Sequence, residues 1–183
     1  LAKYGKSGQG SGDWSDIKSQ KPFFGQVRVS GGKDVGDQLP DLLAKSGYPV
    51  VKASQVTVPP QYPDIHEMRY NIAMHMNSVM QTDIEIGKIL SRLERDGLTE
   101  KTIIFVFADH GSDLPRSKEF CYSEGLHVPL IISVPESIEG IESGTVRGDL
   151  VSLIDVTGTS LGLTNQNITE SMDTLNVFGK SEN

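Results

Sequence analysis

Two apolar runs separated by a polar loop limit the fold of this chain more than any other pattern in it. The first run, Thr102–Ala108, is β-branched and aromatic, and the second, Val128–Val134, is mainly aliphatic. Runs of this length and composition are typical of strands that are buried on both faces. We therefore expect two strands of an internal sheet, with a loop between them that begins at a sheet edge.

The first run ends directly in Asp109, His110 and Gly111. Open α/β sheets bind their ligands at the carboxyl ends of strands, which is where this triplet stands. A carboxylate supplies a hard oxygen and an imidazole supplies a nitrogen, so the first two residues suit a divalent cation, and Gly111 allows a sharp turn beside them. The same triplet also fits a simple β-turn, so the residues alone leave both interpretations open.

A long helical pattern precedes these strands. Apolar residues recur at spacings of three and four over Ile65–Arg95, and polar side chains occupy the opposite side. Gly97 is placed to end the helix. The order helix, strand, loop, strand indicates a crossover connection, which predicts an α/β fold with a mixed, mainly parallel sheet flanked by helices.

The rest of the chain has weaker patterns. Ser152 and Asp155 have the spacing of a capping box at the start of a short helix. Composition predicts four further segments: a loop over residues 1–21, a strand over Pro22–Val29, a surface connector over Lys45–Pro63 and a polar tail without firm structure over residues 164–183.

Composition limits the function classes. The 183 residues suffice for one domain, and the formal net charge of -7 argues against a general nucleic-acid binder, which needs a basic face. A local group of lysines can still attract an anionic substrate. No apolar run approaches the length of a membrane span. The chain begins with Leu and reads from its first residues like the middle of a protein, so we expect a fragment or a processed piece.

The stretch from FADHG through PRSK to YSEGLHVPLIISVP resembles the sulfatases of the alkaline phosphatase superfamily in the order and spacing of its parts. The resemblance extends over most of the chain, and it implies that residues 1–183 are part of a sulfatase catalytic domain with an alkaline-phosphatase-like fold. By this resemblance Asp109 and His110 are two of the metal ligands. Lys118 looks like the catalytic lysine that holds a sulfate oxygen of the substrate.

The resemblance also implies a second substrate-binding residue, a cofactor and a class of substrate. Lys6 looks like a second substrate-binding lysine, with Lys3 in an alternative register, whereas Lys33 is better interpreted as a solvated loop residue. The expected cofactor is a divalent metal, Ca²⁺ first, with Mn²⁺ or Mg²⁺ as alternatives. The nitrogen ligand of His110 tolerates a softer ion such as Mn²⁺. The substrate would be a sulfated small molecule or a sulfated glycan, and the family resemblance suggests a periplasmic or secreted protein.

One part of the family pattern is absent from the sequence. Sulfatases derive their nucleophile from a Cys/Ser-x-Pro/Ala-x-Arg motif, whereas Cys121 is followed by Tyr-Ser-Glu and is expected to pack as a small apolar residue. We therefore expect a middle piece of a sulfatase that neither hydrolyses sulfate esters nor binds metal tightly by itself. Two alternatives stay open: a phosphonate or phosphate ester hydrolase of the same superfamily, and a non-catalytic relative that acts as a binding protein.

Overall fold

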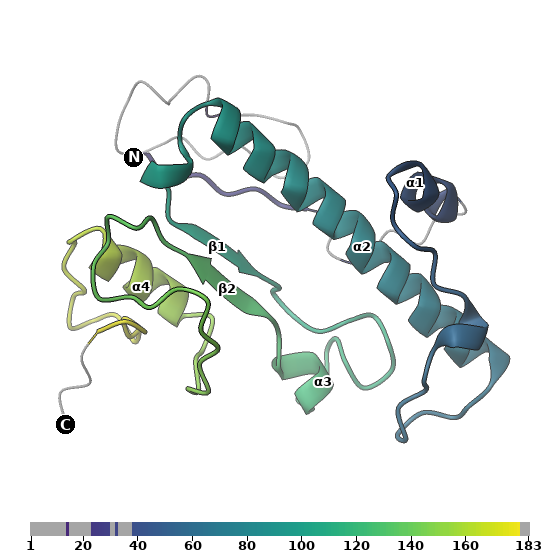
Figure 1. The fold of residues 1–183 in the computed structure, drawn as a ribbon. Coiled ribbons are helices and arrows are strands. Elements are labelled where there is room, and N and C mark those ends of the chain that lie inside the picture. The colour runs from purple at the N-terminus through teal and green to yellow at the C-terminus, as the bar shows by residue number, and fades with distance from the viewer. Residues whose placement is uncertain (1–13, 15–22, 30–31, 33–37, 180–183) are drawn as a thin grey trace.

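A computed structural model describes Trp14, residues 23–29, Gly32 and residues 38–179. Its elements are the helices α1 (Leu39–Lys45), α2 (His66–Arg95), α3 (Ser123–Leu126) and α4 (Asp155–Leu163), the strands β1 (Ile104–Phe107) and β2 (Leu130–Ser133), and two 3-10 turns at Ala53–Gln55 and Thr99–Lys101. The long helix α2 runs beside the sheet, and the sheet lies between α2 and α4 (Figure 1).

The predicted long helix is confirmed as α2, with its first residue one position later than expected. Ile65 precedes the helix in an extended conformation. At the other end Gly97 has a φ of 64°, and the amide of Leu98 donates to the carbonyl of Leu93 at 2.9 Å. This left-handed glycine closes the helix as the sequence predicts.

The core gathers on the first half of α2. One cluster of buried residues joins α2 to the segment before it (Val56, Tyr62, Met68, Ile72 and Ala73), and a second joins α2 to α1 (Leu39, Leu43 and Met74). The prediction of a surface connector over Lys45–Pro63 is therefore wrong for Val56 and Tyr62. Proline prevents regular structure there but does not prevent packing.

A buried amide fixes this connector to the helix. The Asn77 side chain accepts a hydrogen bond from the amide of Val51 at 2.8 Å and donates to its carbonyl at 3.0 Å. Asn77 thus satisfies both backbone groups of one residue, as a neighbouring strand would. The segment before α2 has no regular secondary structure at Val51, and the Asn77 side chain holds it against the helix.

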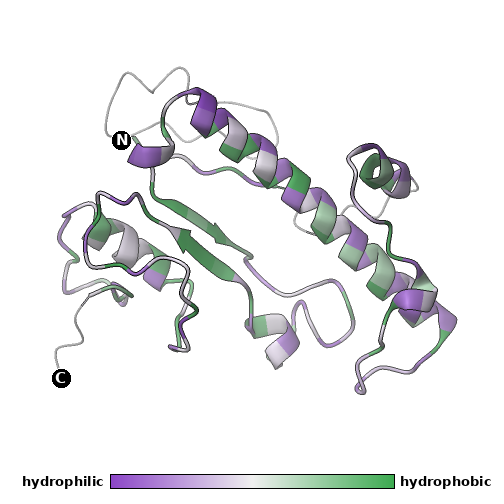
Figure 2. Ribbon diagram, in the orientation of Figure 1, coloured by the Kyte–Doolittle hydropathy of each residue, from purple (hydrophilic) through white to green (hydrophobic). Residues whose placement is uncertain are grey.

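Both predicted strands are present with shorter bounds, and Figure 2 shows both as hydrophobic. They pair antiparallel, with Ile104 opposite Ser133 and Phe107 opposite Leu130. A mainly parallel sheet is thus not confirmed in the described residues. The reason is the connection: it folds back through the single turn of α3 instead of crossing over in a helix, and such a return gives an antiparallel pair.

The predicted burial of these strands on both faces is wrong. Phe107 and Ile131 are exposed, since each strand has only one partner among the residues that the structure describes. The strand predicted over Pro22–Val29 is also wrong for residues 23–29, which have no regular structure and expose Phe24. Apolar composition predicts a strand only where another strand is available to pair with it.

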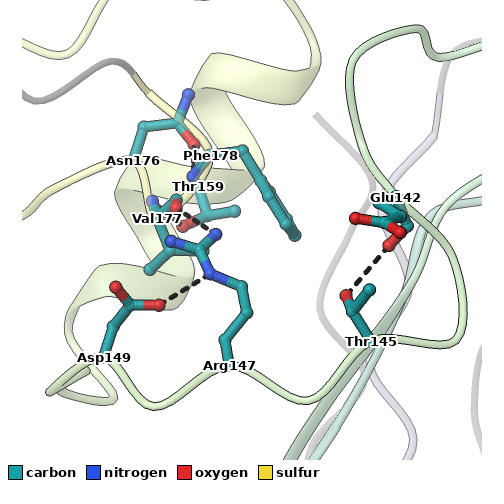
Figure 3. Close-up of polar contacts among 8 residues, drawn as sticks. All are labelled: Glu142, Thr145, Arg147, Asp149, Thr159, Asn176, Val177 and Phe178. Carbon is teal, nitrogen blue, oxygen red and sulfur yellow. Dashed lines mark hydrogen bonds and ion pairs between the residues drawn. The ribbon is translucent and has the colours of Figure 1, made fainter.

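Residues 164–179 contain no helix or strand, yet they are fixed to α4. The Asp155 carboxylate accepts from the amide of Ser152 and from the amide of Leu175, both at 2.9 Å. Only this half of the predicted capping box is present, because α4 begins at Asp155 after Ile154 and has no side-chain cap. Figure 3 shows Arg147 bonded to Asp149 and turned toward Val177, whose carbonyl accepts from the guanidinium at 2.6 Å. The polar tail is therefore a hydrogen-bonded strap across α4.

The predicted loop over residues 1–21 is described only at Trp14. Its indole N–H donates to the Asp96 carboxylate at 2.6 Å, and the guanidinium carbon of Arg92 lies 4.2 Å from the centre of its ring. This side chain is thus attached to the end of α2. None of the helices in the described part of the chain is long and apolar enough to cross a membrane.

Candidate functional site

The predicted site residues lie on the connection between β1 and β2, residues 108–129, which we call the site loop. Its two arms are joined by the hydrogen bond from the amide of Gly111 to the carbonyl of Gly125, at 3.1 Å. A Cβ on Gly111 would overlap the carbonyl oxygen of Glu124, so only glycine allows this approach. The site loop therefore returns on itself directly after Asp109 and His110.

A buried serine holds the middle of the site loop. Ser117 donates from its hydroxyl to the carbonyl of Glu124 at 2.7 Å, and the amide of Lys118 donates to the carbonyl of Ser112 at 2.9 Å. A Cβ on Gly125 would overlap the carbonyl oxygen of Ser117. These contacts fix the backbone on both sides of Lys118.

The site loop is docked on the core of α2. Leu114 packs against the cluster that contains Tyr62, and the Tyr62 hydroxyl donates to the carbonyl of Pro115 at 2.7 Å. The Gln61 amide donates to the Glu124 carboxylate at 2.9 Å. Burial, followed by the nearby charge of Glu124, raises the pKa of Tyr62, which keeps this hydroxyl a donor. The long helix thus positions the loop through the segment before it.

Asp109 and His110 face one another at the start of the site loop. The distance from Nε2 of His110 to Oδ1 of Asp109 is 3.5 Å, and the Asp109 side chain is 80% exposed. Nδ1 of His110 lies 2.7 Å from the carbonyl oxygen of Gly111. Since a carbonyl only accepts, Nδ1 is the donor of this hydrogen bond, and Nε2 is the ring nitrogen on the side of the Asp109 carboxylate.

Lys118 forms a second pair on the same loop. Its ammonium nitrogen lies 3.6 Å from Oδ1 of Asp113, and both side chains are partly exposed. No sequence pattern marks Asp113 as a partner, because its spacing from Lys118 belongs to a loop rather than to a helix. The predicted lysine Lys6, its alternative Lys3, and Lys33 lie outside the described residues.

The described residues provide two donors rather than a complete metal site. No group of three or more His, Cys, Asp or Glu side chains that could hold a metal ion occurs among them. A metal ion held by Asp109 and His110 would need further ligands from outside the described residues. Cys121 is exposed, which corrects the expectation that it packs as an apolar residue.

Two features of the site loop escaped the sequence interpretation. Arg116 and Glu119 adopt left-handed φ values of 66° and 72° although neither is glycine. The guanidinium carbon of Arg116 lies 4.1 Å from the centre of the Tyr122 ring. Backbone strain of this kind is concentrated at ligand and active sites, and no composition signal marks it in advance.

Comparison with known proteins identifies the family of this chain. The family model described as Sulfatase matches residues 14–166. The chain is 33% identical over 132 residues to an ulvan-active sulfatase of Formosa agariphila, which is 72% of this chain and 22% of that protein. It is 32% identical over 87 residues to arylsulfatase K of Homo sapiens, which is 45% of this chain and 16% of that protein. No solved structure gives a significant match.

Proposed function

The chain belongs to the sulfatase family, and we propose that it is part of an enzyme that hydrolyses sulfate esters. The observation that carries the proposal is the family match over residues 14–166, which includes the whole site loop. The chain spans only 22% of the first relative's length, so the activity is proposed for a longer protein that contains it.

In this proposal Lys118 binds a sulfate oxygen of the substrate and acts as a catalytic residue. Negative charge on the sulfuryl oxygens and the leaving oxygen must be stabilised during hydrolysis, and an ammonium group aimed at them does so. The contact of Lys118 with Asp113, at 3.6 Å between partly exposed groups, is a weak ion pair that a monoanionic sulfate ester can replace. Lys6 is proposed as a second substrate-binding lysine.

Asp109 and His110 are proposed as two ligands of a divalent cation, Ca²⁺ first and Mn²⁺ or Mg²⁺ as alternatives. The exposed carboxylate and the lone pair of Nε2 suit such an ion, and the bond from Nδ1 to the Gly111 carbonyl keeps the ring oriented. A bound cation supplies electrostatic stabilisation of the anionic ester. The chain contributes only part of the ligand set in this proposal.

The proposed substrates are sulfated small molecules or sulfated glycans. The chain itself contains no Cys/Ser-x-Pro/Ala-x-Arg sequence. We therefore propose that the 183 residues alone do not turn over sulfate esters, and that the nucleophile belongs to a longer protein.

The test compares 4-nitrophenyl sulfate with 4-nitrophenyl phosphate, using the longest natural protein that contains this chain. The proposal expects hydrolysis of the sulfate ester, its loss on chelation of the metal, and a fall of about 100-fold in kcat for Lys118→Ala. Lys101→Ala, which removes an exposed lysine outside the site loop, is the matched control and should retain full activity. Preferred hydrolysis of the phosphate ester, or full activity of Lys118→Ala, would contradict the proposal.

A further inference from the structure

An aromatic pair and a guanidinium form an exposed surface on the site loop. The rings of Phe120 and Tyr122 are stacked, with 6.2 Å between their centroids and 18° between their planes. Phe120 is 54% exposed and Tyr122 is 45% exposed. Arg116 covers the Tyr122 ring at 4.1 Å. We call these three residues the ledge.

The ledge contributes nothing to either buried cluster of the described residues. Large aromatic side chains that remain this exposed as a group mark binding surfaces more often than isolated ones do. Arg116 takes part in none of the ion pairs found among the described residues, so its charge is not neutralised by a carboxylate. It also holds a left-handed φ of 66° at a non-glycine position.

The ledge is rigidly connected to the proposed sulfate-binding lysine. Ser117, which is buried and hydrogen-bonded to the Glu124 carbonyl, lies between Arg116 and Lys118 in the chain. The amide of Phe120 donates to the carbonyl of Ser117 at 3.1 Å. Lys118 is thus only a few residues along the chain from the aromatic rings and the guanidinium of the ledge.

We propose that the ledge is a subsite for a sulfated glycan. The apolar face of a sugar ring packs on Phe120 and Tyr122, and the planar guanidinium of Arg116 binds a sulfate of the same glycan through paired N–H donors. This inference rests on the proposed function and deepens it, because it selects a glycan over a small sulfate monoester.

The test is the affinity of the longest natural protein that contains this chain for dextran sulfate oligosaccharides, measured by calorimetry against unsulfated dextran oligosaccharides of the same length. Arg116→Gly removes the guanidinium and suits the left-handed backbone, so it leaves the fold intact. We expect it to weaken binding about tenfold, the loss of a charge-assisted hydrogen bond. We expect a similar loss of about tenfold for Tyr122→Ala, which removes the stacking surface.

Two matched controls distinguish binding at the ledge from non-specific binding to exposed charged or aromatic side chains. Arg28→Gly removes an exposed guanidinium, and Phe24→Ala removes an exposed aromatic ring, both outside the site loop. Each should bind the sulfated oligosaccharide as the unchanged chain does. Equal affinity for unsulfated dextran, no binding of the sulfated probe, or an equal loss in the controls would overturn the proposal.

The readout does not depend on hydrolysis, so the two proposals fail separately. If the longer protein hydrolyses sulfate esters but Arg116→Gly and Tyr122→Ala bind normally, the ledge proposal is overturned alone. If the ledge variants lose affinity and the longer protein hydrolyses no sulfate ester, the ledge is supported and the proposed enzyme activity is not.

Discussion

Hydrogen bonds hold both the site loop and the C-terminal strap, residues 164–179, in place, but the carboxylate of α4 that binds the strap and the carboxylate at the start of the site loop have opposite roles. In the strap region, Asp155 is 8% exposed and accepts two backbone amides. In the site loop, Asp109 is 80% exposed and its carboxylate lies beside the ring of His110. The Asp155 carboxylate is used for structural hydrogen bonds, whereas the Asp109 carboxylate is exposed to a ligand.

This difference shows how a candidate site can be separated from structural polar residues. Both segments contain acidic and hydroxyl side chains, and composition alone does not distinguish them. The site loop obtains its rigidity mainly from close backbone contacts at glycines and from one buried serine, and the Asp109 carboxylate takes part in none of these contacts. The strap obtains its rigidity from the charged groups themselves, such as Arg147 and Asp155.

The largest effect should come from closing the space between the arms of the site loop. In Gly111→Ala the new Cβ overlaps the carbonyl oxygen of Glu124, and the two backbones must separate. We expect the free energy of unfolding to fall by about 3 kcal/mol, the upper range for overpacking. Thermal unfolding measures this, with faster amide exchange in the site loop than in the strap.

The matched control is Gly87→Ala in α2, where nothing lies within 4 Å of the new methyl group. It should raise the free energy of unfolding by about 0.5–1 kcal/mol, because alanine is the better helix former. Equal stability of Gly111→Ala and the unchanged chain would show that the loop is not held as described.

A smaller loss is expected from the strap. Asp155→Ala removes the acceptor of the Ser152 and Leu175 amides, and should lower the free energy of unfolding by about 2–3 kcal/mol, the range for hydrogen bonds to a charged group. Hydrogen exchange at the amide of Leu175 should accelerate. Unchanged protection of that amide would contradict the structural role of this carboxylate.

Ser117→Ala tests the site loop through its one buried hydroxyl. The variant loses the bond to the Glu124 carbonyl, and we expect the free energy of unfolding to fall by about 1–2 kcal/mol. Urea unfolding measures the change. An unchanged free energy of unfolding, or a loss of stability confined to the strap, would show that Ser117 does not support the site loop.

The smallest effect concerns pH. The hydrogen bond from Arg147 holds the pKa of Asp149 below its ordinary value of 3.8. The ionised carboxylate is therefore favoured in the folded chain, and its contribution is present above pH 3.8 and is lost as the pH falls through the lower folded value. The difference in unfolding temperature between the unchanged chain and Asp149→Asn should shrink with acid; a difference that grows would contradict the pairing.

The sequence predicts those features of the structure that depend on residues close together in the chain. The helix α2 was predicted nearly to the residue because its apolar stripe and Gly97 act within a few positions. The positions of the two strands were predicted, but the direction of their pairing was not. That direction depends on the contact of Gly111 with Gly125, which turns the site loop back on itself. Adjacent Asp109 and His110 were found together, whereas the pairing of Lys118 with Asp113 depends on the path of the loop.

The most direct measurement is made on Asp109→Ala in the longest natural protein that contains this chain, with the rate of sulfate-ester hydrolysis and the unfolding temperature recorded on the same sample. Because this carboxylate is 80% exposed, the free energy of unfolding should stay within about 0.5 kcal/mol of the unchanged protein. Hydrolysis should fall by about 100-fold or more, as for the loss of a group that stabilises developing charge. A variant that keeps its rate, or one that loses its rate only because it unfolds, would contradict the division between the two segments.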